Sequence, residues 1–88
     1  MQYILSKRFV KDFTKLPPAT KKKALVSLEK FTQDPQNPVL RNHGLSGKWK
    51  GHFSINVTGD TRAVYFVVED SLVRFIAIGS HSELYGWE

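Results

Sequence analysis

Apolar residues repeat with a helical period near the start of the chain and with a period of two in its second half. A short β-prone stretch at residues 3–5 precedes Ser6, a residue type favoured at helix N-caps. A first helical run then continues to Pro17-Pro18, and a second covers residues 19–33. Their expected core-facing residues are Phe9, Val10, Phe13 and Leu16, followed by Ala24, Leu25, Leu28 and Phe31. The pattern predicts a strand followed by a helical hairpin.

The second half of the chain predicts strands. Alternation over residues 47–57 indicates a strand whose buried face includes Trp49. Its polar face would carry Lys48, Lys50, His52, Ser54 and Asn56. Residues 61–68 and 72–78 are rich in β-branched and aromatic side chains, and short turns join these runs, which predicts an antiparallel meander followed by a tail. The order β-α-α-β-β-β predicts an α+β fold, with the N-terminal helical hairpin packed on an antiparallel sheet.

Length and composition narrow the possible classes. A chain of 88 residues with 41% hydrophobic content suits one domain, residues 1–88. The absence of cysteine excludes disulfides, thiolate zinc sites and cysteine nucleophiles. Three histidines without a close pair predict no metal site, and we expect no cofactor. There is no secretory signal and no apolar run near the ~20 residues of a membrane span, so we expect a cytoplasmic protein.

Positive charge is concentrated in the first part of the chain. The net charge is +5, and residues 1–50 contain eleven basic and three acidic side chains. Such a distribution favours a polyanion or an acidic protein as partner. The excess of basic residues is explained equally well if the lysines only keep the helices soluble.

Several polar residues would meet at one side and one end of the predicted sheet. His43 precedes the meander, Asp60 and Arg62 flank its first turn, and His81 and Tyr85 follow its last strand. Each has an ordinary structural explanation, such as a turn residue or an ion pair. Together they provide what metal-free RNA cleavage requires: a base for the 2′-hydroxyl, an acid for the 5′-oxygen and positive charge beside the phosphate. A tyrosine ring can also stack on a base.

Three segments of the chain resemble the RelE/ParE toxin superfamily, and most closely its YafQ-like branch. They are residues 43–51 (HGLSGKWKG), 59–65 (GDTRAVY) and 79–85 (GSHSELY). The resemblance implies a toxin of a type II toxin–antitoxin pair, monomeric alone and hetero-oligomeric with an acidic antitoxin. Active members of the superfamily enter the ribosomal A site and cut mRNA there without a metal.

The resemblance also implies a role for each candidate residue. His81 would be the general acid, His43 or Asp60 the base, Arg62 the phosphate ligand and Tyr85 the residue that positions the nucleotide. Further RNA contacts are expected from Lys48, Lys50 and His52 near the site, and from Lys7, Lys11, Lys15, Lys22 and Lys23 on the helices.

The chain departs from the superfamily pattern at three positions. Ser54 and Asn56 stand where other members carry lysines, or an acid and a histidine, and Ala77 stands where an arginine is expected. With fewer charges in the centre, either Lys48, Lys50 and His52 compensate, or the activity is weak, or the protein is a ParE-like toxin that inhibits DNA gyrase without a nuclease centre. A separate alternative is a non-catalytic RNA- or protein-binding domain.

Overall fold

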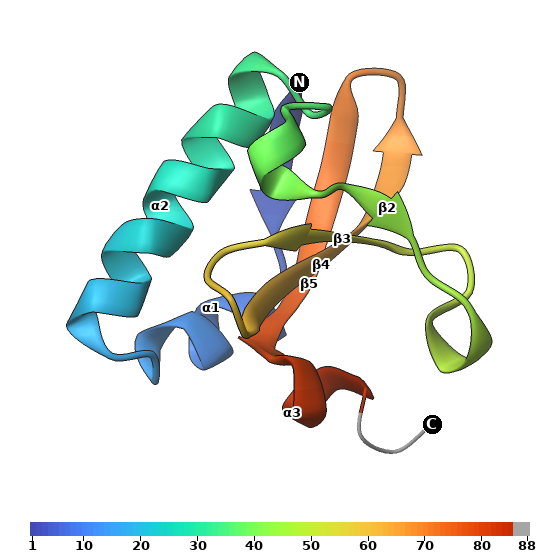
Figure 1. Ribbon diagram of the computed structural model, residues 1–88. Coiled ribbons are helices and arrows are strands. Elements are labelled where there is room, and N and C mark those ends of the chain that lie inside the picture. The colour runs from blue at the N-terminus through green and yellow to red at the C-terminus, as the bar shows by residue number, and fades with distance from the viewer. Residues whose placement is uncertain (86–88) are drawn as a thin grey trace.

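The computed structural model describes residues 1–85, which form a five-stranded sheet with helices on both of its faces (Figure 1). The strands are β1 (Gln2–Leu5), β2 (His43–Gly44), β3 (Phe53–Asn56), β4 (Thr61–Glu69) and β5 (Leu72–Ser80). The helices are α1 (Lys7–Thr14), α2 (Pro18–Gln33) and α3 (His81–Tyr85), with short 3₁₀ helices η1 (Pro38–Leu40) and η2 (Gly47–Trp49).

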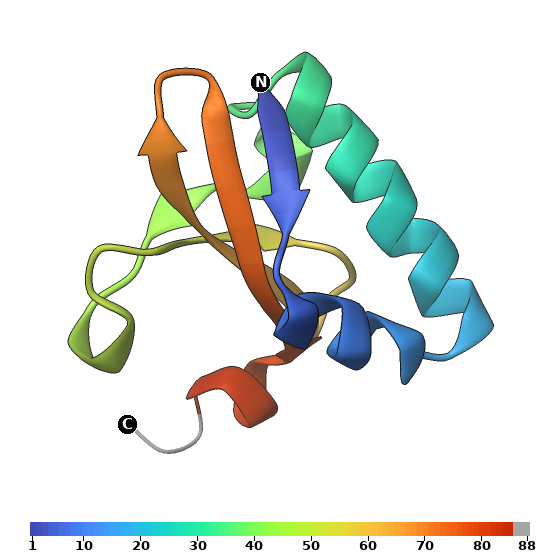
Figure 2. The same ribbon diagram turned by 180° about the vertical axis from the view of Figure 1, so that it is seen from behind.

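The strand order in the sheet is β1-β5-β4-β3-β2. All neighbouring strands are antiparallel except β1 and β5, which run parallel at one edge (Figure 2). The helical hairpin and strands β2, β3 and β4 all lie between these two strands in the chain, so the parallel pair has the long connection that it requires. The α+β fold, with a helical hairpin packed on a mostly antiparallel sheet, is confirmed.

The main core lies between the helical hairpin and the sheet. Phe75 on β5 is fully buried, and its ring contacts the rings of Tyr3, Phe9, Phe31 and Tyr65. Two of the expected core residues are instead exposed, Val10 at 47% and Leu25 at 57%. Each directly follows a buried residue on its helix, and successive side chains point about 100° apart around a helix.

A second, smaller core lies on the opposite face of the sheet. Val64 on β4 points away from the helical hairpin because side chains alternate along a strand. It packs with Trp49, Ala77 and Leu84, three residues that are also buried. The indole Nε1–H of Trp49 donates to the carbonyl of Leu84 at 2.9 Å, so the placement of Trp49 in a core is confirmed and η2 is fastened to α3.

The strand predicted over residues 47–57 is wrong in its first part. Residues 47–49 form η2, and only Phe53–Asn56 form a strand. Between them Gly51 adopts a φ of 89°, a conformation that glycine tolerates. Lys48 therefore lies on η2, and Lys50 and His52 lie on the loop after it. Ser54, expected on a polar face, is fully buried because the second core covers that face.

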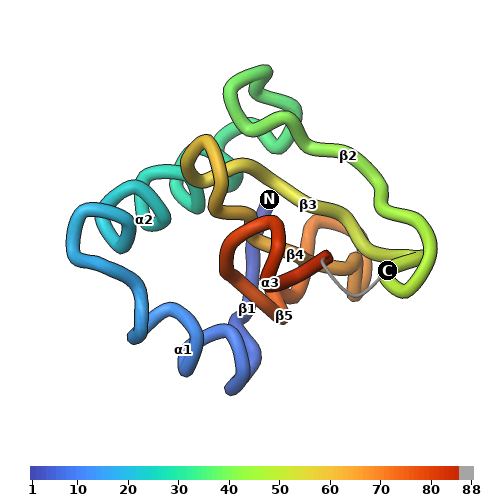
Figure 3. The backbone as a smooth tube through the Cα atoms, turned by 60° about the horizontal axis from the view of Figure 1, so that its bottom comes forward, coloured from blue at the N-terminus to red at the C-terminus, as the bar shows by residue number. Residues whose placement is uncertain are grey.

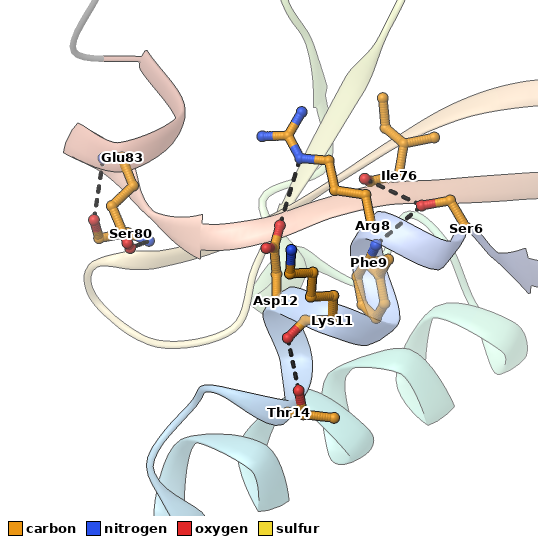
Figure 4. Close-up of polar contacts among 9 residues, drawn as sticks. All are labelled: Ser6, Arg8, Phe9, Lys11, Asp12, Thr14, Ile76, Ser80 and Glu83. Carbon is orange, nitrogen blue, oxygen red and sulfur yellow. Dashed lines mark hydrogen bonds and ion pairs between the residues drawn. The ribbon is translucent and has the colours of Figure 1, made fainter.

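The expected tail contains helix α3, which the period-based analysis missed. Ser80 and Glu83 form a reciprocal cap (Figure 4): Ser80 N–H donates to Glu83 Oε1 at 2.8 Å, and Glu83 N–H donates to Ser80 Oγ at 3.1 Å. The Ser-x-x-Glu spacing at residues 80–83 is the local signal for this helix start. The cap places His81 in the first turn of α3.

The predicted N-cap at Ser6 is confirmed, and it also joins the first helix to the sheet. Ser6 Oγ accepts a hydrogen bond from Phe9 N–H at 3.0 Å and donates one to the carbonyl of Ile76 at 3.2 Å (Figure 4). Ile76 is the extra residue at a register shift, since its neighbours Phe75 and Ala77 pair with consecutive residues of β4. The serine thereby satisfies the carbonyl of the bulged residue in β5.

Candidate active site

A cleft of about 660 Å³ opens on the face of the sheet that carries α3. Four of the five residues expected at the site line it: His43, Arg62, His81 and Tyr85. They come from β2, β4 and α3, elements that are distant in the chain. The rest of the lining is Arg41, Gly44, Leu45, Ser46, Trp49 and Asn56. The structure thus brings four of the five side chains together, and their roles in a reaction stay a prediction.

Asp60, the fifth candidate, does not line the cleft. It is exposed in the turn between β3 and β4. Its main-chain carbonyl accepts a hydrogen bond from the N–H of His81 at 2.9 Å. In this structure Asp60 supports the site through its backbone rather than through its carboxylate.

His43 has a defined tautomer. Its Nδ1 lies 2.7 Å from the carbonyl oxygen of Arg41, and a carbonyl oxygen only accepts, so Nδ1 carries a proton. The neutral ring then has its lone pair on Nε2. Nε2 is therefore the ring nitrogen that can accept a proton from a ligand.

His81 and Tyr85 lie next to each other on α3. Their ring centroids are 4.7 Å apart with an interplanar angle of 70°. The hydroxyl of Tyr85 donates to the buried Oγ of Ser54 at 3.1 Å, which anchors the ring to β3. Ser54, one of the departures from the superfamily pattern, thus has a structural role below the cleft.

The guanidinium of Arg62 both binds the turn between β3 and β4 and lines the cleft. Its Nη1 donates to the carbonyls of Thr58 and Gly59, each at 3.1 Å, and to that of Thr61 at 3.3 Å. Among the contacts that the structure describes for residues 1–85, Nε and Nη2 have no protein partner. A fixed guanidinium with free donors is suited to hold a phosphate.

The other expected RNA-contacting residues lie outside this cleft. Lys48 and Lys50 are exposed on η2 and the loop after it, and His52 packs edge-on against Trp49 and Phe66 at 5.5 and 5.7 Å. Lys7, Lys11 and Lys15 are exposed on or next to α1, and Lys22 and Lys23 line a separate groove along α2. RNA contact by these residues stays a prediction.

Arg41 contributes to the site and was not foreseen, and the neighbouring Asn42 makes hydrogen bonds that hold this segment. Arg41 lines the cleft and adopts a left-handed conformation with a φ of 48°. Asn42 donates to the carbonyl of Pro35 at 3.0 Å and accepts from the hydroxyl of Tyr65 at 2.8 Å. Burial raises the pKa of Tyr65, which keeps its hydroxyl protonated as the donor. No local sequence signal marks these contacts.

The reciprocal cap on α3 should weaken at low pH, because it depends on the ionised carboxylate of Glu83. The Ser80 N–H that donates to Glu83 Oε1 is the main cause of a pKa below the usual value for the Glu83 carboxyl. Because the folded-state pKa is lowered, the stabilisation is fully present above the unfolded pKa of ~4.3 and is lost as the pH falls through the folded value. We expect the NMR resonance of the Ser80 amide to follow this titration and Glu83→Gln to abolish it. An unchanged profile in that variant would contradict the role of Glu83.

Neither a metal cluster nor a membrane span is found in the part of the chain that the structure describes. No three His, Cys, Asp or Glu side chains there are grouped so that they could hold a metal ion. None of the helices within residues 1–85 is long and apolar enough to cross a membrane.

Comparison with known proteins identifies the family. Residues 1–86 match the family model described as "Bacterial toxin of type II toxin-antitoxin system, YafQ". The chain is 33% identical over 82 residues to the mRNA interferase toxin YafQ of Escherichia coli K12, covering 93% of this chain and 82% of that protein.

Two solved structures extend the comparison. The E. coli DinJ–YafQ toxin–antitoxin complex includes a chain that is 30% identical, with a TM-score of 0.69 and coverage of 96% of both chains. A YoeB/ParE toxin from Agrobacterium tumefaciens shares the fold alone, with a TM-score of 0.75, 18% identity and coverage of 92% of this chain and 99% of that one. The protein therefore belongs to the YafQ family of bacterial toxins of type II toxin–antitoxin systems.

Proposed function

We propose that this protein is a ribosome-dependent mRNA interferase that cleaves RNA without a metal. The observation that carries the proposal is the cleft, which combines two imidazoles, a guanidinium with free donors and an anchored phenol. Among residues 1–85 no acidic side chain lines it, so from these residues a phosphate would meet only neutral and positive groups. The E. coli relative is named an mRNA interferase, which supports the same reaction class.

The proposed reaction is an internal transesterification. Nε2 of His43 takes the proton of the ribose 2′-hydroxyl, and the resulting oxygen attacks the adjacent phosphorus. The bond from phosphorus to the 5′-oxygen breaks, and protonated His81 gives that oxygen its proton. The products are a 2′,3′-cyclic phosphate and a free 5′-hydroxyl, and the proton taken up by His43 replaces the one that His81 has given.

His43 is the better candidate for the base. Its Nδ1–H is engaged by the Arg41 carbonyl, which leaves Nε2 free to accept a proton inside the cleft. The exposed carboxylate of Asp60 does not line that space. Arg62 would bind the phosphate and stabilise the charge that develops on it, with Arg41 as a second cation. Tyr85 would stack on the nucleotide next to the cleaved bond.

The proposed partners are the ribosome with its mRNA and an acidic antitoxin. The basic first half of the chain supports attachment to ribosomal RNA, because phosphate contacts give affinity without sequence choice. The DinJ–YafQ complex of E. coli supports a hetero-oligomer of toxin and antitoxin.

The test combines cleavage on ribosomes with a gyrase assay. We expect the purified protein to cut an mRNA bound to ribosomes, mapped by primer extension, and to leave the free mRNA much less affected. End analysis should find a 2′,3′-cyclic phosphate. Inhibition of gyrase supercoiling without RNA cuts would favour the ParE-like alternative and overturn the proposal. Inactivity in both assays would favour a non-catalytic binding domain.

A further inference from the structure

The segment from Leu40 to His43 connects the main core to the active-site cleft. In Figures 1 and 3 the green segment that contains η1 runs directly into β2, which lies beside β3. Leu40, at the end of η1, is fully buried in the main core, whereas Arg41 and His43 line the cleft. The position of His43 therefore depends on how the backbone leaves the core.

Arg41 has a strained backbone conformation in the middle of this segment. Its φ of 48° and ψ of 45° lie in the left-handed region, which residues with a side chain rarely adopt. Such a conformation persists only where the surrounding structure determines it. In this conformation the Arg41 carbonyl oxygen lies 2.7 Å from Nδ1 of His43. The direction of the carbonyl thus depends on the residues that hold Arg41 in place.

Asn42, the next residue, is fixed by two hydrogen bonds from different parts of the fold. Its Nδ2 donates to the carbonyl of Pro35 at 3.0 Å, and its Oδ1 accepts from the hydroxyl of Tyr65 at 2.8 Å. Both bonds are partly buried, so losing one would leave a polar group with little access to water. We call Asn42 with these two partners the Asn42 clamp. The clamp fixes one side of Arg41, and the buried Leu40 fixes the other.

The Tyr65 hydroxyl is a rigid donor to this clamp. The side chain is 5% exposed and lies on β4. Its ring contacts three other aromatic rings, with centroid distances of 5.0, 5.4 and 5.1 Å to Phe31, Phe53 and Phe75. A close-packed ring cannot turn its hydroxyl elsewhere without disturbing the core. The main core thereby determines where Asn42 lies.

The tautomer of His43 depends on this arrangement. In a neutral imidazole, the hydrogen bond of one ring nitrogen determines which of the two carries the proton. The Arg41 carbonyl selects Nδ1–H, which leaves Nε2 as the acceptor. If Arg41 relaxed from the left-handed region, its carbonyl would turn away and the Nε2–H tautomer would become available. A ring with its proton on Nε2 has no lone pair there to take the proton of a 2′-hydroxyl.

We propose that Asn42 and Tyr65 are positioning residues for His43: they hold Arg41 in its left-handed conformation, so that its carbonyl keeps the proton on Nδ1 and leaves Nε2 free to act as the base. Neither Asn42 nor Tyr65 lines the active-site cleft. The effect on cleavage rests on the proposed function, whereas the effect on the tautomer does not. The two effects are therefore measured separately.

The first test observes the imidazole of His43 by NMR in the ¹⁵N-labelled full chain without RNA. At a pH above the ordinary titration range of histidine, the shifts of the two ring nitrogens distinguish Nδ1–H from Nε2–H. We expect Nδ1–H in the wild-type protein. Asn42→Ala removes both bonds of the clamp and should change the ratio of the tautomers about tenfold toward Nε2–H. Tyr65→Phe removes only the hydroxyl and should cause a smaller change in the same direction.

Two matched controls separate this effect from a general loss of stability. Tyr3→Phe removes a hydroxyl from another tyrosine of the main core and leaves the clamp intact. Ser6→Ala removes two hydrogen bonds at the start of α1, so it should lower the free energy of unfolding in urea to a similar extent. Both should keep Nδ1–H. Retention of Nδ1–H in Asn42→Ala, or an equal change in Ser6→Ala, would overturn the proposal.

The second test measures ribosome-dependent cleavage. Asn42→Ala should lower kcat by about 10–10²-fold with little change in KM, because a misdirected base affects the reacting geometry rather than binding. Ser6→Ala should cleave at the wild-type rate. A changed tautomer without any loss of cleavage would overturn the catalytic part of the proposal and leave the clamp intact. Absence of cleavage by the wild-type protein would instead contradict the proposed function alone.

Discussion

Replacing His81 with alanine is expected to lower the rate of mRNA cleavage by about 10²–10⁴-fold, the usual contribution of a general acid. The change removes the proton donor for the leaving 5′-oxygen. The fold should tolerate it, because the side chain is exposed and the hydrogen bond to the Asp60 carbonyl comes from the His81 backbone. Single-turnover cleavage on ribosomes and urea unfolding measure the two effects separately.

The matched control for this variant is Ser82→Ala, an exposed neighbour on α3. It should retain wild-type cleavage and unfolding. An RNA substrate with a better leaving group than the ribose 5′-oxygen should partly rescue His81→Ala, because such a group needs no protonation. Wild-type cleavage by His81→Ala would remove this histidine from the mechanism.

Replacing Arg62 with lysine is expected to lower the cleavage rate by about 10²-fold or more, the cost of removing a donor that stabilises transition-state charge. The guanidinium donates through Nη1 to three carbonyls of the turn and keeps Nε and Nη2 for a ligand. A lysine ammonium is a single point and cannot occupy both positions. The loss should therefore appear in cleavage even where the turn remains formed.

Two further variants separate the roles of Arg62. Arg62→Ala should add a loss of stability, measured by urea unfolding, because the turn carbonyls also lose their donor. The control is Arg74→Lys on β5, an exposed arginine that lines neither the active-site cleft nor the groove along α2, and it should behave like the wild-type protein. A fully active Arg62→Lys would mean that no bidentate grip on phosphate is needed.

Much of the fold follows from local pattern. The helical spacing around Phe9 and Phe31, the N-cap at Ser6 and the two long strand runs all predicted the elements that form. The failures come from tertiary context. Trp49 continues the alternating pattern of β3, but it lies in the 3₁₀ helix η2, and its indole N–H donates to α3. The alternation of apolar residues alone does not distinguish a strand residue from a residue buried in such a turn.

The candidate site was predictable to a similar extent. His43, Arg62, His81 and Tyr85 were expected to converge, and they line one cleft. The contribution of Arg41 was missed because its position depends on a left-handed backbone conformation with no glycine to signal it. The groove along α2 that Lys22 and Lys23 line was not foreseen either, since its two walls come from elements that only the folded chain places together.

The separation of the apolar residues into two clusters bears on how the molecule responds to heat. The cluster around Trp49 and Leu84 is the smaller, and the main core around Phe75 does not include α3. Elements with few apolar contacts open at a lower free energy than the whole domain. On warming, α3 would detach while most of the domain is still folded, and it would take His81 and Tyr85 out of the cleft. Loss of activity at a temperature below the melting point would then be reversible on cooling.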